Sequence, residues 1–188
     1  MEKENEQLLE KIKGCISYYY PKGLNEVFDW EVMYETVEYK SLMQKLEKSG
    51  SDWSQWNLFK ENLDKMGIGF SDYSTPAKYN GCFHIQIRLM PSLILLICVS
   101  PIFPAYFFMT IEPPHGVRAF WCKCPWEHEQ FHQVLELFKS IYPKHVLIPE
   151  EILKVKIPNY SVDPFNLGEA RVINYLFTHL TQFDDMLI

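Results

Sequence analysis

One pentapeptide of this chain carries the residue types of a catalytic zinc site. Residues 128–132 read His-Glu-Gln-Phe-His, which is an HExxH pattern. On a helix the two histidines lie one turn apart and can ligate zinc, while the glutamate serves as a general base. The sequence therefore offers a metal-dependent hydrolase as one functional alternative.

The helix that would carry this motif argues against that alternative. It opens at Cys124-Pro125, and its apolar residues form one stripe, namely Phe131, Val134, Leu135, Phe138, Ile141 and Tyr142. At about 100° per residue, Glu129 points away from this stripe and His132 lies beyond its edge, whereas a zinc site needs them in a cleft. No third ligand follows at a recognisable spacing. We expect His128 and His132 to be surface residues, and we expect neither a metal ion nor a cofactor.

Other catalytic signatures are also missing from the sequence. Cys122-Lys123-Cys124 is a CxC pair without the second pair that a tetrahedral zinc site requires. There is no GxSxG elbow for a nucleophilic serine and no glycine-rich loop for a phosphate. We therefore predict no catalytic residues and a protein that is not an enzyme.

Composition indicates one globular domain over residues 1–188. Hydrophobic residues make up 47% of the chain, enough to bury a large core. Its 24 acidic residues exceed its 18 basic ones, which disfavours nucleic acid as a partner and suits a basic protein instead. The five cysteines are expected to be reduced and buried. The charged N-terminus lacks a signal-peptide pattern, so a cytoplasmic location is expected.

The elements that must position any site are organised around an uncharged stretch from Leu89 to Ile111. Its length would suffice to cross a bilayer, but Pro91, Pro101 and Pro104 interrupt it, and we expect no membrane span. Prolines and a rich content of β-branched and aromatic residues favour an antiparallel meander. The predicted strands are Phe83 to Met90, Leu93 to Val99, Ala105 to Ile111 and Val117 to Cys122.

Amphipathic helices are predicted on both sides of this meander in the sequence. The predicted ranges are Asn5 to Tyr20, Thr36 to Lys48, a helix capped by Asp52 or Ser54 that ends before Gly67, and the helix of Phe131. Phe70 to Tyr73 is a candidate short strand, and residues 148–160 are expected to form turns and a strand. The predicted fold class is α+β, a central antiparallel meander covered by helices mainly on one face.

Residues 25–38 are the most acidic part of the chain and also hold several aromatic side chains. Their apolar residues follow no clean period, so the type of secondary structure stays open. One interpretation is a solvated face over a buried one. The other is a partner-binding surface, for which the candidate residues are Glu26, Asp29, Trp30, Glu31, Glu35 and Glu38.

The order of several short segments resembles immunity proteins of bacterial polymorphic toxin systems. These segments are Tyr20-Pro21-Lys22-Gly23, Glu38-Tyr39-Lys40-Ser41-Leu42, Trp56, Val99-Ser100-Pro101, Tyr106, Ile148-Pro149-Glu150-Glu151-Ile152-Leu153, Lys156-Ile157-Pro158 and Leu176-Phe177. The resemblance implies a cytoplasmic, non-catalytic inhibitor. Such a protein binds a cognate toxin, encoded by an adjacent gene, and occludes or distorts its active site.

Two alternatives stay open beside this resemblance. The first is the metal-dependent hydrolase that would use residues 128–132. The second is a non-catalytic scaffold or oligomerisation module, which would form a homo-oligomer without an external partner, for example by strand addition at a sheet edge.

Overall fold

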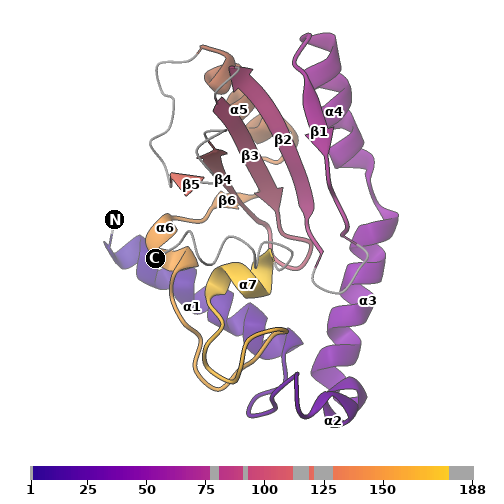
Figure 1. The fold of residues 1–188 in the computed structure, drawn as a ribbon, viewed down its shortest axis with the longest axis vertical. Coiled ribbons are helices and arrows are strands. Elements are labelled where there is room, and N and C mark those ends of the chain that lie inside the picture. Colours follow the sequence, from indigo (N-terminus) through magenta and orange to yellow (C-terminus); the bar gives the residue numbers. More distant parts are fainter. Residues whose placement is uncertain (1, 77–80, 91–92, 112–118, 121–128, 178–188) are drawn as a thin grey trace.

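The computed structural model describes residues 2–76, 81–90, 93–111, 119–120 and 129–177 (Figure 1). Its helices are α1 (Glu2–Tyr19), α2 (Trp30–Glu35), α3 (Val37–Ser51), α4 (Ser54–Lys65), α5 (Glu129–Ile141), α6 (Glu150–Leu153) and α7 (Val172–Leu176). Its strands are β1 (Phe70–Asp72), β2 (Phe83–Met90), β3 (Leu93–Val99), β4 (Ala105–Ile111), β5 (Ala119–Phe120) and β6 (Val146–Leu147). This is an α+β fold, as the sequence predicts.

The strands form one sheet in the order β1-β2-β3-β4-β5, with every neighbouring pair antiparallel. β6 adds a short parallel pairing to β4, opposite Ala105 and Tyr106. The three central strands have the predicted bounds, since the prolines between them prevent a longer strand from forming. The predicted strand from Val117 to Cys122 is confirmed at Ala119 and Phe120, and its other residues lie outside the described part of the chain.

Helices cover both faces of the sheet, and the prediction that they cover mainly one face is wrong. Side chains alternate along β3, so Leu95, Ile97 and Val99 pack with α4 and α5 on one face. Leu96 and Cys98 pack with α1, α3, α6 and α7 on the other. In Figure 1, α5 lies behind the strands, while α1, α6 and α7 are grouped below them. The sheet is thus the middle of three layers.

The C-terminal region contains more helix than expected. Residues 150–153 form α6, with Pro149 at its N-cap and two glutamates in its first turn, where a turn-and-strand stretch was predicted. Proline and acidic residues favour the start of a helix, so the local signal was present. The expected strand character is limited to a bridge between Lys156 and Arg171.

None of the helices in the described part of the chain combines enough length with enough apolar character to cross a membrane. The apolar stretch from Leu93 to Ile111 forms β3 and β4 with the turn between them, as expected from its prolines.

Candidate protein-binding surface

The acidic segment lies at the end of the molecule farthest from the centre of the sheet. After α1 the chain turns at Pro21 to Gly23, forms the short helix α2 and continues into α3. Figure 1 shows α2 at the lower end of α3, away from the strands. Gly23 has a φ of 80°, a left-handed conformation that glycine adopts without a steric cost. This turn allows the segment to project from the body of the fold.

Large apolar side chains are concentrated on the outside of this segment. The exposed ones are Val27, Phe28, Trp30, Val32, Tyr34 and Val37. Phe28 is 74% exposed and Val37 is 77% exposed. On the surface of a monomer, exposed apolar residues are usually scattered singly. A cluster of them with a polar rim is typical of a protein-binding site.

Carboxylates border these apolar side chains, but they are not equivalent. Glu35 Oε2 lies 2.7 Å from Lys40 Nζ in an exposed ion pair. Asp29 Oδ2 accepts a hydrogen bond of 2.8 Å from the backbone N–H of Asn25, so its charge stabilises the local turn. Glu31 and Glu38 form no hydrogen bond or ion pair with any described residue. These two carboxylates are therefore the ones available to a partner.

We define the acidic-aromatic surface as the six exposed apolar residues together with Glu31, Glu35 and Glu38. Its shape depends on contacts between α2 and α3. Thr36 Oγ1 donates a hydrogen bond of 2.7 Å to Met33 O and accepts one of 3.2 Å from Tyr39 N–H, which caps α3. Tyr34 packs against Tyr39, with ring centroids 4.7 Å apart. The surface is thus presented by two helices joined at Thr36.

Glu26 differs from the other predicted contact residues, because it is buried with only 5% of its surface exposed. Its backbone N–H donates a 2.6 Å hydrogen bond to Ser161 Oγ, and its Oε2 accepts a 2.8 Å bond from Asp163 N–H. The prediction of Glu26 as a surface contact is therefore wrong. Glu26 instead joins the start of the acidic segment to the loop that precedes α7.

No cation compensates the buried Glu26 carboxyl among the described residues that influence it. Burial raises the pKa of Glu26 to about 7, the Asp163 N–H opposes this rise, and the Asp163 carboxylate adds to it. The neighbouring ionisable groups are the phenols of Tyr20, Tyr39 and Tyr175, whose pKa values are raised mainly by burial. Glu26 therefore changes charge near neutral pH.

The structure describes only part of the HExxH motif, because His128 lies outside the described residues. Glu129 and His132 are exposed at the start of α5, while Phe131 is buried in the core, so the described part of the motif faces outward. Within the described residues, no three His, Cys, Asp or Glu side chains come together to hold a metal ion. Cys122 and Cys124 also lie outside those residues; Cys15, Cys82 and Cys98 are free thiols.

Sequence reasoning identified the carboxylates and Trp30 of this surface but not Phe28, Val32 or Val37. The signal in the sequence was that the apolar residues of this segment follow no helical or strand period. Without such a period, they cannot all lie on one buried face. Comparisons of the chain with family models, curated proteins and solved structures find no match.

Proposed function

We propose that this chain is a non-catalytic immunity protein, which binds a cognate bacterial toxin in the cytoplasm and neutralises it stoichiometrically. The observation that carries the proposal is that six exposed apolar side chains lie within residues 27–38, together with Glu31 and Glu38, which pair with no described residue. The order of short segments that resembles immunity proteins supports the same class of function. The proposal does not involve a metal ion or a cofactor.

The side chains of the acidic-aromatic surface indicate which features a partner surface should have. Phe28 and Trp30 are rigid aromatic side chains that fit apolar depressions, and aromatic anchors contribute most to the binding energy of many interfaces. Glu31 and Glu38 favour lysine or arginine residues around those depressions. A basic toxin domain fits this pattern, since this chain has a net charge of −6.

A second copy of this chain is a weaker candidate for the same surface. In a symmetric dimer each patch meets an identical patch, so Glu31 and Glu38 would face carboxylates of the same kind. Like charges brought together in an interface oppose association. The charge of the surface therefore favours a different, basic protein as the partner.

Co-expression with the product of the adjacent gene tests the function. We expect this chain to restore growth to cells that express that product, and purified chain to abolish its activity at a molar ratio near one, because inhibition is by occupancy. A version with Phe28→Ser and Trp30→Ser should lose both effects, whereas Leu58→Ser, which alters an exposed apolar residue on α4, should keep them. Growth that stays arrested, or inhibition by trace amounts of the chain, would contradict the proposal.

A further inference from the structure

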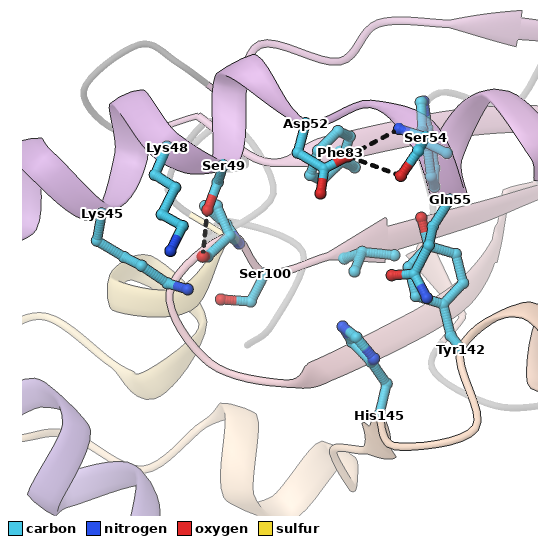
Figure 2. A pocket seen from close by; sticks show the side chains of 13 residues that line it. Lys45, Lys48, Ser49, Asp52, Ser54, Gln55, Phe83, Ser100, Tyr142 and His145 are labelled. Carbon is cyan, nitrogen blue, oxygen red and sulfur yellow. Dashed lines mark hydrogen bonds between the residues drawn. The ribbon is translucent and has the colours of Figure 1, made fainter.

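A pocket of about 250 Å³ lies at the other end of α3 from the acidic-aromatic surface (Figure 2). The last turns of α3, the start of α4, the turn between β3 and β4, and the connection from α5 to β6 all contribute to its lining. The pocket has room for about eight water molecules, at about 30 Å³ each. It is slightly smaller than the pockets that hold drug-sized ligands.

The floor of the pocket is apolar and fixed in place. It includes Trp56, Phe83 and Val99, which are all buried in the core. The rings of Trp56 and Phe83 lie with their centroids 5.3 Å apart. The indole N–H of Trp56 already donates to Asp72 Oδ2 at 3.2 Å, so the indole brings no unsatisfied polar group to the pocket. Because Trp56 is 1% and Phe83 is 8% exposed, the floor presents only a small apolar area to a ligand.

Three hydrogen-bond donors meet at one end of the pocket. In Figure 2 the ammonium groups of Lys45 and Lys48 extend toward the hydroxyl group of Ser100. Neither lysine forms an ion pair with any described carboxylate. Ser100 is 5% exposed, and its Oγ accepts hydrogen bonds from the N–H groups of Ile102 and Phe103. The Ser100 hydroxyl hydrogen has no acceptor among the described residues, so it remains available to a ligand.

The other polar groups of the pocket do not neutralise this end. Asp52 is the lining carboxylate, but its Oδ1 accepts hydrogen bonds of 3.1 Å and 2.7 Å from the N–H and hydroxyl groups of Ser54. Figure 2 shows Asp52 turned toward Ser54 rather than toward the lysines. Burial lowers the pKa of His145, so its imidazole lines the pocket in the uncharged form at neutral pH. The local positive charge thus comes from Lys45 and Lys48.

We propose that this pocket binds a small organic oxyanion, whose carboxylate or phosphate group contacts Lys45, Lys48 and Ser100 while its small apolar body lies against the exposed edge of Phe83. Charge-assisted hydrogen bonds to an anion are among the stronger polar contacts. The site is separate from the acidic-aromatic surface, since the seven residue steps of α3 from Glu38 to Lys45 rise about 10 Å along the helix axis. This proposal does not depend on the toxin-binding function.

Titration of the full-length, ¹⁵N-labelled protein with phenyl phosphate and with benzoate, followed by NMR, tests the proposal. We expect saturable shifts of the amide signals of Lys48, Ser100 and His145 with at least one of the two probes. Comparison of the probes tells whether the pocket takes a phosphate or a carboxylate. Phenol, which has the ring without the charge, should produce no saturable shift.

The double variant Lys45→Gln/Lys48→Gln should weaken binding roughly tenfold or more, because two charged donors are lost. The matched control is Lys40→Gln/Lys65→Gln, which lowers the net charge equally at exposed positions outside the pocket and should bind as the unmodified protein does. Absence of a saturable shift with both anions would overturn the proposal. Equal weakening in both double variants would also overturn it, because the anion would then respond only to net charge.

Discussion

At the scale of single residues, the most informative side chain is the buried carboxyl of Glu26. It connects residues 24–29 to residues 161–163, and these two segments are far apart in the sequence. Sequence reasoning placed Glu26 on the surface because acidic runs are usually solvated. Its burial depends on hydrogen bonds to Ser161 and Asp163, and no local pattern near Glu26 indicates those partners.

The raised pKa of Glu26 predicts a pH dependence of stability. Its pKa is about 7 in the folded protein and near 4.5 when unfolded, so the folded state binds the proton more tightly. The stabilisation is therefore complete below about pH 4.5 and is lost as the pH rises through 7. The loss is of the order of 3 kcal/mol in the free energy of unfolding.

Urea unfolding of the wild type and of Glu26→Gln at pH 5 and pH 8 measures this effect. The wild type should lose more stability than Glu26→Gln between the two pH values, because glutamine keeps the shape of the side chain without its charge. Comparing the two proteins cancels the contributions of the other titrating groups, including His145. Glu31→Gln, which changes an exposed carboxylate, should follow the wild type, and an identical slope for all three would refute the account of Glu26.

At the scale of elements, the acidic-aromatic surface depends on the junction between α2 and α3. A helix of six residues is too short to be stable alone, so α2 relies on its packing and on its link to α3. Thr36 supplies that link by contacting Met33 and capping α3.

Replacing Thr36 with alanine should therefore lower the free energy of unfolding by about 1 kcal/mol, the usual effect of losing an N-cap. Amide hydrogen exchange within α2 should accelerate as well, because the hydrogen bond from Thr36 to Met33 is also lost. Thr36→Ser keeps the hydroxyl group and should resemble the wild type. If Ala and Ser at this position behave alike, the hydroxyl group has no role in the junction.

The three-layer arrangement predicts that both faces of β4 are equally important for stability. Phe107 packs with the cluster of α1 and α7, while Phe108 packs with that of α4 and α5. Substituting either residue with alanine should cost about 3–5 kcal/mol in unfolding free energy, the usual range for a buried phenylalanine. Leu58→Ala on exposed α4 surface should change stability by only about 0.5 kcal/mol. If the alanine substitution at Phe107 or Phe108 changed the unfolding free energy as little as Leu58→Ala does, the sheet face on which that phenylalanine lies would not be covered by helices.

Much of this fold could be predicted from local patterns. Prolines and β-branched residues define β2, β3 and β4, and apolar stripes at helical spacing define α1, α3, α4 and α5. The stripe of a helix shows that one face is buried, but it does not show against which face of the sheet. That is why the helices were expected to cover mainly one face of the sheet.

For the candidate site, the carboxylates could be predicted, but the exposure of Phe28 and Val37 depends on how α2 projects from the fold.

At the scale of the whole molecule, net charge and the position of the carboxylates determine how a partner approaches. A chain with a net charge of −6 attracts a basic protein over distances of about one Debye length. Glu31 and Glu38 concentrate this attraction at the acidic-aromatic surface.

Reversing Glu31 and Glu38 to lysine should therefore reduce the association rate with the proposed toxin partner roughly tenfold at low salt, with a smaller change in the dissociation rate. The difference from wild type should shrink as salt is added, because the field is screened. Glu61→Lys/Asp64→Lys changes the net charge equally on α4 and serves as the control for stopped-flow measurements. Equal slowing by both pairs would mean that net charge alone steers the encounter.

The central claim is our proposal that residues 27–38 bind a cognate toxin, and calorimetric titration of the adjacent gene's product tests it most directly. For Phe28→Ser/Trp30→Ser we predict a loss of at least 2 kcal/mol in binding free energy, as for interface hot spots, with urea unfolding confirming that the variant is folded. Leu58→Ser should bind as the wild type does. Wild-type affinity for Phe28→Ser/Trp30→Ser, or no binding by the unmodified chain, would contradict the claim.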